Sequence, residues 1–389
     1  LAKNGTYFTR CHVSNPICTP SRAAILTGQY GFHNGVTFFG QAINPGTPTI
    51  GPLLMEQGYK TGYVGKWHND HRPIDYGFEY MRHVFLGGMH DYESIPVVQG
   101  SRDRPREIYR NPTEVFTDGA LDLLDGPLQD PFALFLCYTP PHDPRTSPPE
   151  YEALYPPEQV TLPPNFMPMP RFDTGTLGIR DERLLERPLD PLEVRREIGR
   201  YYAMITHIDD QLGRVLRFLD QSGRLRNTIV VFAGDNGLTL GAHGLLGKQT
   251  MYEEGIRVPL IIRGPGIRTA HRCHTLVDLM DIMPTMCDFA GADIPSEVDG
   301  MSLEPFTAGR ETEERESIFC HYEDLFRMVK TDRYKLILHL RTDREEVFDL
   351  YSDPLELLDL SRSRKHQAIQ GKLQRLLEDW RERAGEMLE

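Results

Sequence analysis

Short apolar runs alternate with amphipathic stretches along the first 310 residues of the chain. The apolar runs are rich in β-branched and aromatic residues, which predicts strands at residues 6–13, 61–65, 131–138, 228–233 and 258–262. Between them, apolar positions at helical spacing predict helices at residues 47–57, 114–124, 193–219 and 276–290. Strands that alternate with helices predict an α/β sandwich with a mostly parallel central sheet flanked by helices.

The pattern changes beyond about residue 310. Short segments at residues 317–322, 327–331, 334–340 and 346–350 are joined by charged turns and predict antiparallel strands. An amphipathic stretch at residues 366–384 predicts a terminal helix. We therefore predict a large α/β domain at residues 1–310 and a small C-terminal α+β subdomain with an antiparallel sheet at residues 311–389.

Two long segments, residues 69–111 and 143–191, carry no regular pattern and contain many prolines, glycines and arginines. Loops of this length are uncommon in compact domains unless they are functional. Because loops tolerate variation, we expect these two segments to shape the pocket that selects the substrate.

Composition and charge limit the classes of function. The 389 residues are 39% hydrophobic and 25% charged, as is usual for a globular protein. The formal net charge of −13 repels polyanions, which argues against nucleic-acid binding and requires a local basic pocket for any anionic substrate. No apolar run reaches the length of a transmembrane segment. The six scattered cysteines are too few for a disulfide scaffold and lack paired metal-ligand spacing.

The run from Cys18 to Gly28 has the chemistry of a nucleophile placed at the start of a helix. Thr19 is a suitable N-cap, Pro20 suits the first helical position, and Gly28 permits a stop. A thiol just ahead of a helix lies in a positive field that also suits sulfate or phosphate. Arg22, one turn further on, adds a positive fork for the same anion. Taken alone, Cys18 fits a buried structural cysteine better than a nucleophile.

Polar residues follow several of the predicted strands. They are Lys66, His68, His142, Asp235 and Asn236. In open α/β sheets ligands bind at the carboxyl ends of the strands, so we expect these side chains to meet around the helix that carries Cys18. Asp235 and Asn236 offer hard oxygen ligands that suit Ca²⁺ or Mg²⁺. By itself, Asp-Asn-Gly also fits an Asx turn at a strand end.

Four motifs occur in order along the chain. They are Cys18-Thr19-Pro20-Ser21-Arg22 with Thr27-Gly28 after a small apolar run; Gly65-Lys66-Trp67-His68; Pro141-His142-Asp143-Pro144; and a run with His243-Gly244, Gly247-Lys248 and Tyr252-Glu253-Glu254-Gly255-Ile256-Arg257-Val258-Pro259. Together they closely resemble the type I, formylglycine-dependent sulfatases of the alkaline-phosphatase-like superfamily. The resemblance implies an alkaline-phosphatase-like sandwich and hydrolysis of a sulfate ester, for which we expect a sulfated carbohydrate.

The resemblance also implies roles for the matched residues. Cys18 would be converted to formylglycine by a maturation enzyme, and the hydrated aldehyde would attack sulfur. The implied catalytic residues are Cys18, Arg22, Lys66, His68, His142 and Lys248. The implied substrate contacts are Lys66, His142, His243 and Lys248. A divalent cation, Ca²⁺ with Mg²⁺ as the alternative, would be bound by Asp235, Asn236 and the modified Cys18.

Each charged group has a step in the implied mechanism. Arg22, Lys66 and Lys248 would stabilise the charge on the sulfuryl oxygens, together with the cation. His142, alone or with Lys248, would protonate the leaving oxygen. His68 would then remove a proton from the hydrate, which expels sulfate and restores the aldehyde.

The chain departs from the family pattern in two places. Family members begin with an apolar strand that ends in paired aspartates, and no residues before Cys18 match it. The pair Asp209-Asp210 lies in a predicted helix, so this role is not transferred to it. We therefore expect an N-terminally incomplete sequence that lacks half of its metal ligands, binds metal poorly and is inactive or unstable. Asn69-Asp70 stands where the family has an apolar residue and Gly, which we expect to alter substrate preference.

Two alternative functions fit the same sequence. A phosphonate or phosphate-diester hydrolase of the same superfamily can share the formylglycine motif and needs a similar anion clamp. A non-catalytic binder of sulfated glycans would fit a chain without half of the metal site. The resemblance further implies a periplasmic, secreted or lysosome-like compartment.

Overall fold

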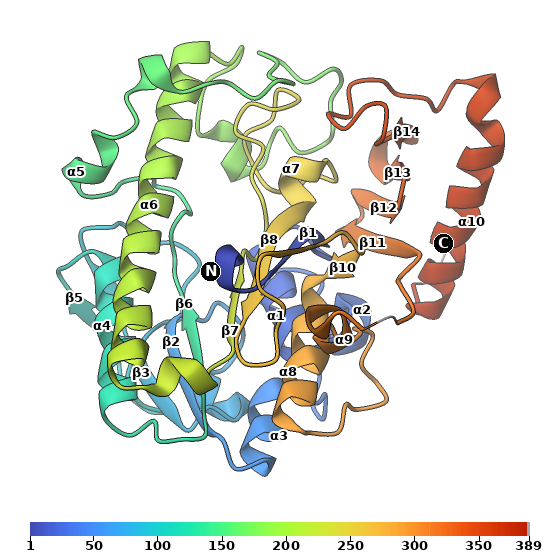
Figure 1. The fold of residues 1–389 in the computed structure, drawn as a ribbon. Coiled ribbons are helices and arrows are strands. Elements are labelled where there is room, and N and C mark those ends of the chain that lie inside the picture. The colour runs from blue at the N-terminus through green and yellow to red at the C-terminus, as the bar shows by residue number, and fades with distance from the viewer. Residues whose placement is uncertain (311, 387–389) are drawn as a thin grey trace.

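A computed structural model describes residues 1–310 and 312–386, in which strands and helices alternate along the chain (Figure 1). The strands are β1 (Thr6–His12), β2 (Lys60–Lys66), β3 (Tyr80–Phe85), β4 (Ile95–Val97), β5 (Arg106–Ile108), β6 (Phe132–Cys137), β7 (Val230–Ala233), β8 (Arg257–Arg263), β9 (His271–Cys273), β10 (Val277–Asp278), β11 (Ser317–Tyr322), β12 (Phe326–Thr331), β13 (Tyr334–His339) and β14 (Arg344–Asp349). The helices are α1 (Cys18–Thr27), α2 (Gly31–Asn34), α3 (Ile50–Glu56), α4 (Pro112–Asp125), α5 (Pro149–Glu152), α6 (Pro191–Gln221), α7 (Glu253–Ile256), α8 (Ile282–Ala290), α9 (Glu304–Ala308) and α10 (Gln367–Arg383).

Two sheets form the main body of the molecule. In the first, β2 lies between β3 and β6, and both pairs are parallel. The second has the order β10-β1-β8-β7, with β9 also paired to β1. There, β1 is parallel to β9 and β10, while β8 is antiparallel to both β1 and β7. Parallel pairs are therefore the majority in the main body, which confirms the predicted sheet type.

Helices cover both faces of the first sheet. Successive side chains of a strand point to opposite faces, and β2 shows this directly. Tyr63 packs with residues of α1, α3 and α8, whereas Val64 packs with residues of α4 and α6. The α6 helix, on the left of Figure 1, lies alongside α4. This helix–sheet–helix packing is the predicted sandwich.

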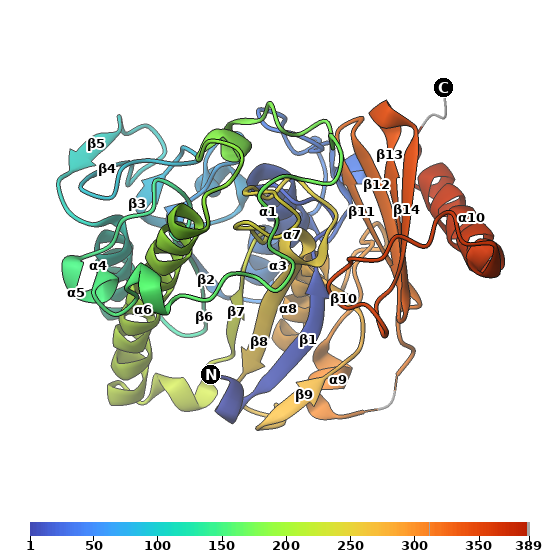
Figure 2. The ribbon, with the colours of Figure 1, turned by 90° about the horizontal axis from the view of Figure 1, so that it is seen from above.

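The C-terminal sheet has the order β11-β12-β13-β14 and is antiparallel throughout. Its two faces bury different sets of residues. Cys320 and Met328 belong to the apolar cluster of β1 and β8, while Val329 and Leu336 pack with Trp380 of α10. Figure 2 shows α10 on the side of this sheet that faces away from the main body. The predicted antiparallel sheet and terminal helix are confirmed, and the boundary at residues 310 and 311 stays a prediction.

Three sequence expectations about secondary structure were wrong. Residues 69–111 are not irregular throughout, because β3 pairs with β2 and β4 pairs with β5. The half-buried, polar-containing β3 sequence Tyr80–Phe85 has no continuous apolar run to reveal it. The helix expected at residues 276–290 begins at Ile282, because β10 and a capped 3-10 turn at Leu279–Asp281 precede it. The helix expected at residues 47–57 begins at Ile50, after Thr49.

None of the helices in the described part of the chain combines the length and the apolar character needed to cross a membrane.

Candidate active site

The helix α1 places Cys18 at its first residue. The residue ahead of it, Ile17, has extended backbone angles and occupies the N-cap position. Thr19 is therefore inside the first turn, and the expectation that it caps the helix was wrong. Its hydroxyl instead donates to the carbonyl oxygen of His68 at 2.9 Å. Gly28 ends the helix in the left-handed conformation, with φ of 67°, as expected.

The Cys18 thiol is buried beside two lysines. Lys248 Nζ lies 3.7 Å from Cys18 Sγ, and both lysines are almost fully buried. Burial by itself would raise the pKa of the thiol, but the positive charges of Lys66 and Lys248 outweigh it and hold the pKa of Cys18 well below its usual value. Burial lowers the pKa of Lys66. The side chain at position 18 thus lies in a pocket of positive potential that would stabilise an anion.

Arg22 links the helix to the end of β7. Its Nε and Nη2 atoms each lie 2.9 Å from Asp235 Oδ2, and its Nη1 donates to the Lys66 carbonyl oxygen at 3.0 Å. Ser21 Oγ donates to the Asp235 carbonyl oxygen at 2.6 Å. Burial alone would raise the pKa of Asp235, but Arg22 and Lys66 lower it well below the ordinary value. The Asp235 carboxylate is therefore ionised and held in place. Asn236 follows it and donates to Asp235 Oδ1 at 2.9 Å.

His142 and Lys248 face each other across the opening. Lys248 Nζ lies 2.9 Å from His142 Nε2. Burial alone would lower the pKa of Lys248, but the Cys18 thiolate and the Asp181 carboxylate raise it above its ordinary value. The carbonyl oxygen of His142 accepts a hydrogen bond from Tyr92 at 2.8 Å. The imidazole is thus anchored from its own backbone while its Nε2 meets the lysine.

His68 contacts Cys18 and lies two residues after the end of β2. It has a φ of 53°, a left-handed conformation that is uncommon for residues other than glycine. The hydrogen bond from Thr19 holds its backbone. Burial lowers the pKa of the imidazole, although a hydrogen bond with Cys18 opposes this shift. A neutral imidazole next to position 18 is suited to accept a proton.

A cavity of about 60 Å³ opens onto these groups. It is lined by Cys18, Arg22, Lys66, Tyr138, Thr139, Pro140, Pro141, His142, Asp143, Tyr201, Asp235, Asn236, Leu238 and Lys248. We call this the Cys18 cavity. The structure thus brings together most of the site residues singled out in the sequence, with His68 in contact with Cys18 beside them.

His243 does not belong to the described residues that line the Cys18 cavity. Its buried ring is stacked on Tyr252, with 3.8 Å between ring centroids, and Asn165 Nδ2 lies 3.0 Å from its Nε2. Burial is the main cause that lowers the pKa of His243 to about 3, and the positive charge of Arg171 adds to it. This placement gives His243 structural contacts and argues against its expected role as a substrate contact.

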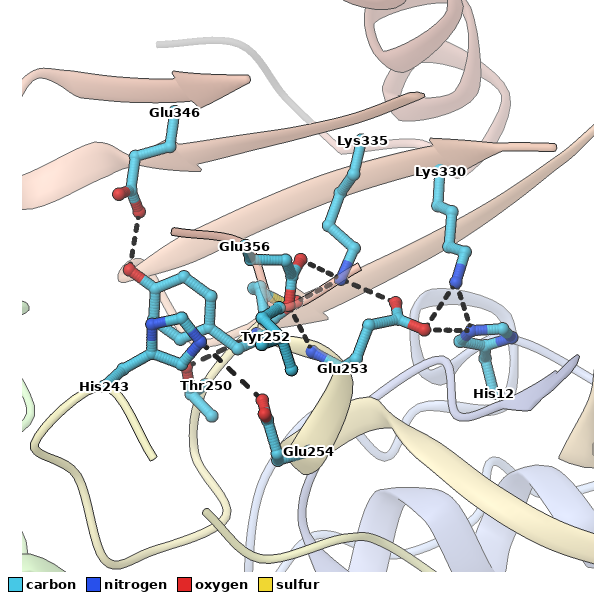
Figure 3. Close-up of polar contacts among 12 residues, drawn as sticks. His12, His243, Thr250, Tyr252, Glu253, Glu254, Lys330, Lys335, Glu346 and Glu356 are labelled. Atoms are coloured by element: carbon cyan, nitrogen blue, oxygen red, sulfur yellow. Dashed lines mark hydrogen bonds and ion pairs between the residues drawn. The ribbon is translucent and has the colours of Figure 1, made fainter. Parts of the chain in front are cut away.

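A second group of charged residues lies between the main body and the C-terminal sheet (Figure 3). We define this interface cluster as His12, Glu253, Lys330, Lys335 and Glu356. Lys335 Nζ lies 2.7 Å from Glu253 Oε1 and 2.6 Å from Glu356 Oε1. Lys330 Nζ lies 2.6 Å from Glu253 Oε2 and 2.8 Å from His12 Nε2. Each lysine therefore has at least one carboxylate in direct contact.

Glu356 of this cluster and its neighbours His243 and Glu254 each offer a ligand atom, and these atoms lie within 4.8 Å of one another. The spacing would permit a metal ion. However, Asn165 Nδ2 lies 3.0 Å from His243 Nε2 and 2.7 Å from Glu254 Oε1. Glu356 is likewise in contact with Lys335. Donors within the chain thus already contact each of the three residues, although Glu254 Oε2 is buried without a hydrogen-bond partner among the described residues.

Sequence reasoning missed polar residues of the irregular segment at residues 143–191. Asp181 Oδ2 lies 3.6 Å from Lys248 Nζ, and Arg180 contacts both Asp181 and Asp143. Arg180 and Asp181 belong to a short 3-10 turn, Arg180–Arg183. The one signal in the sequence is a run of four charged residues inside a proline-rich stretch, and that run does not reveal its partners.

A model of the sulfatase family matches residues 1–292 of the chain. The chain belongs to the sulfatase family. A second model, for the C-terminal region of N-sulphoglucosamine sulphohydrolases, matches residues 241–383. The resemblance stated from the motifs is therefore confirmed, and the chain is a sulfatase, an enzyme that hydrolyses sulfate esters.

Known relatives agree with this assignment. The sulfatase is 26% identical to the N-acetylglucosamine-6-O-sulfatase of Bacteroides thetaiotaomicron, over 97% of this chain and 80% of that protein. It also superposes on a protein solved in complex with its substrate D-glucosamine-2-N,6-O-disulfate, with a TM-score of 0.87 and 25% identity over 99% of this chain and 92% of that one.

The fold is shared more widely. A phosphonate monoester hydrolase from Silicibacter pomeroyi superposes with a TM-score of 0.81 and 24% identity, over 98% of this chain and 89% of that one. The alkaline-phosphatase-like architecture expected from the sequence is thereby confirmed.

Proposed function

We propose that this sulfatase removes a sulfate group from a sulfated carbohydrate, with a formylglycine made from Cys18 as the nucleophile and a divalent cation as cofactor. The observation that carries the proposal is the convergence of Arg22, Lys66 and Lys248 on the Cys18 cavity at a helix N-terminus. A sulfate group is a compact anion, and fixed cations around the reacting centre stabilise the charge that develops on it. Cys18 is the one residue of the cavity that the sulfatase motif marks for oxidation.

The lining of the cavity fits a hard divalent cation in the type of its donors. Asp235 supplies an ionised carboxylate, and Asn236 supplies an amide beside it, both on the cavity wall. Oxygen donors of this kind suit Ca²⁺, with Mg²⁺ as the alternative, and the family uses a metal. When bound there, the cation would act as a Lewis acid on the sulfuryl group. In the mechanism we propose, Asp235 and Asn236 hold it next to position 18.

The proton transfers are assigned to two histidines that contact Cys18. His142 Nε2 faces the opening with Lys248 Nζ at 2.9 Å, so this pair holds the proton that the leaving oxygen takes. His68 contacts the side chain at position 18 and has a pKa lowered by burial, so it is neutral and able to accept the proton of the hydrate. Arg22 and Lys66 orient the sulfuryl oxygens and take no part in proton transfer.

The carbohydrate is inferred from relatives. The glucosamine derivatives named for two of them carry sulfate on nitrogen or on O6. We propose a sulfated amino sugar as the substrate class and a periplasmic, secreted or lysosome-like compartment for the protein. The formylglycine-generating maturation enzyme is the partner that this chemistry requires.

Mass spectrometry of the peptide that contains Cys18 tests the proposal most directly. The protein is produced in a host with the maturation enzyme, and conversion of thiol to aldehyde is read as a loss of mass at Cys18. The same preparation is then assayed with an aryl sulfate and with an aryl phosphate diester. Unmodified Cys18 would remove the proposed nucleophile. A higher kcat/KM for the diester would favour the phosphonate or phosphate-diester hydrolase instead.

A further inference from the structure

Five charged or titratable side chains form a closed ring of polar contacts at the rim of the Cys18 cavity. Lys248 Nζ lies 2.9 Å from His142 Nε2 and 3.6 Å from Asp181 Oδ2. Arg180 spans two carboxylates: its Nη1 lies 3.0 Å from Asp181 Oδ1, and its Nη2 contacts Asp143 Oδ2. Asp143 closes the ring, because its Oδ1 lies 3.3 Å from His142 Nδ1.

The backbone of Asp143 determines which nitrogen of His142 carries a proton. His142 Nδ1 lies 2.7 Å from the carbonyl oxygen of Asp143. A carbonyl oxygen only accepts, so Nδ1 carries a proton, and in the neutral ring Nε2 has the free lone pair. That lone pair accepts a hydrogen bond from Lys248 Nζ. The two residues thus share one exchangeable proton, at the end of the pair that points into the cavity.

The charges of the ring also balance. Arg180 and Lys248 each carry a positive charge, and Asp143 and Asp181 each carry a negative charge. Without Arg180, Asp143 and Asp181 would each lose an ion pair, and Lys248 would remain in contact with Asp181. Asp181 would then draw Lys248 toward itself, and Asp143 would lose the partner that holds it beside the imidazole. The planar guanidinium directs Nη1 to one carboxylate and Nη2 to the other in a fixed geometry, which the single ammonium group of a lysine does not reproduce.

We propose that Arg180 is a positioning residue that holds the His142–Lys248 pair in the geometry needed to protonate the leaving oxygen. The inference rests on the proposed function, because it assumes that this pair is the general acid. Arg180 comes from the segment that the sequence predicted to be irregular, and 47% of its side chain is exposed. Its ion pairs therefore matter through the residues they orient and contribute little to the stability of the fold.

The test compares the matured wild-type protein with Arg180→Gln on a series of aryl sulfates whose phenols range from acidic, such as 4-nitrophenol, to weakly acidic, such as 4-methoxyphenol. General acid catalysis contributes about 10²- to 10⁴-fold. A displaced acid should therefore lower kcat by about 10- to 100-fold for the weakly acidic phenols, which need a proton to leave. The 4-nitrophenyl ester should change little, so the plot of log kcat against phenol pKa becomes steeper. Arg180→Lys should show most of the same increase in slope as Arg180→Gln.

Arg183→Gln is the matched control, since Arg183 is exposed on the same 3-10 turn. It should leave both kcat and the slope unchanged. An equal loss of kcat for every ester in Arg180→Gln, or an unchanged slope, would overturn the inference while leaving the sulfatase activity in place. A wild-type protein that cleaves neither these aryl sulfates nor a sulfated amino sugar would instead contradict the proposed function.

A second measurement does not depend on turnover. In protein labelled with ¹⁵N at histidine, His142 assigned through its Gln variant should show a protonated Nδ1 and an unprotonated, hydrogen-bonded Nε2. Arg180→Gln should move these two ring-nitrogen shifts, whereas Arg183→Gln should not. Identical His142 shifts in wild-type and Arg180→Gln would also overturn the inference.

Discussion

The Cys18 cavity and the interface cluster contain the same types of charged residue in opposite arrangements. Lys66 and Lys335 are both almost completely buried lysines. Lys335 contacts the carboxylates of Glu253 and Glu356 at 2.7 and 2.6 Å and donates to the Met251 carbonyl oxygen at 3.0 Å. Of the described residues, none brings a carboxylate within ion-pair distance of Lys66.

The pKa shifts of the two lysines reflect this difference. Burial lowers the pKa of Lys66. Burial also acts to lower the pKa of Lys335, but the attraction of Glu253 and Glu356 outweighs it and raises that pKa. A buried cation without a carboxylate partner costs free energy, and an anionic ligand recovers that cost. The unpaired lysine therefore marks a site for an anion, and the paired lysine marks a structural contact between the main body and the C-terminal sheet.

The largest effect on kcat is expected when the nucleophile at position 18 is removed. Cys18→Ala should lower kcat by at least about 10⁴-fold, because loss of a covalent nucleophile removes the whole chemical step. Its melting temperature should stay close to that of the wild type, since Cys18 lines the cavity and Ala removes only its sulfur atom. Assays with an aryl sulfate, together with thermal unfolding, check both expectations. Residual activity above 1% in the purified variant would contradict the assigned role.

The two lysines should then respond in opposite ways. Lys335→Met should destabilise the fold by about 3–5 kcal/mol, because it leaves buried carboxylates without their cation. Lys66→Met should leave the free energy of unfolding unchanged or higher and should lower kcat by about 10²- to 10³-fold. Urea unfolding and steady-state kinetics of both variants measure the contrast. If Lys66→Met lost as much free energy of unfolding as Lys335→Met, the proposed difference between the two regions would be wrong.

Much of the fold could be predicted because its strands have clear one-dimensional signals. The continuous apolar run of β6 and the short C-terminal segments joined by charged turns each correspond to an observed strand. The β3 strand could not be found this way, because Arg82 and His83 interrupt its apolar positions and parallel pairing with β2 stabilises it instead. The start of α1 was misplaced for a similar reason. Thr19 was expected to cap the helix, but its hydroxyl donates to His68, a residue 49 positions away, and α1 begins at Cys18.

The site residues likewise include some that could be predicted from the sequence and some that could not. Lys66, His142 and Asp235 follow strands, so the topology of an α/β sheet was enough to bring them together. Arg180 lies in a segment without periodicity, and its role depends on contacts 37 residues away that no local pattern encodes. His243 was assigned to the substrate because it stands next to matched motif residues, but proximity in sequence did not put its ring in the cavity.

A smaller effect is expected from the pH dependence of the interface cluster. Burial is the main cause that lowers the pKa of His12 to about 4, and Lys330 adds to it. Between pH 6.5 and pH 4, His12 binds a proton in the unfolded chain, where its pKa is near 6.5, but not in the folded chain. Stability from this group is therefore present above pH 6.5 and is lost as pH falls toward 4, at about 1.4 kcal/mol per pH unit.

His12→Gln isolates this contribution from those of Lys330, Glu253 and Lys335, which surround the ring. Between pH 6.5 and pH 5, the wild type should lose about 2 kcal/mol more stability than the variant. Urea unfolding of both proteins at the two pH values measures the difference. Equal losses would mean that His12 is already protonated in the folded cluster.

The smallest effect is expected for carboxylates that belong to neither region. Asp209 and Asp210, the only Asp-Asp pair of the sequence, are exposed on α6, and Asp210 accepts a hydrogen bond from Tyr151 at 2.9 Å. The double change Asp209→Asn and Asp210→Asn should alter stability by no more than about 0.5 kcal/mol. It should also leave the Ca²⁺ concentration for half-maximal activity unchanged, whereas Asp235→Asn should raise it at least about tenfold, because that carboxylate lines the Cys18 cavity. Calcium titrations of the two variants make the comparison, and a raised requirement in the double variant would show that acidic residues of α6 take part in metal binding.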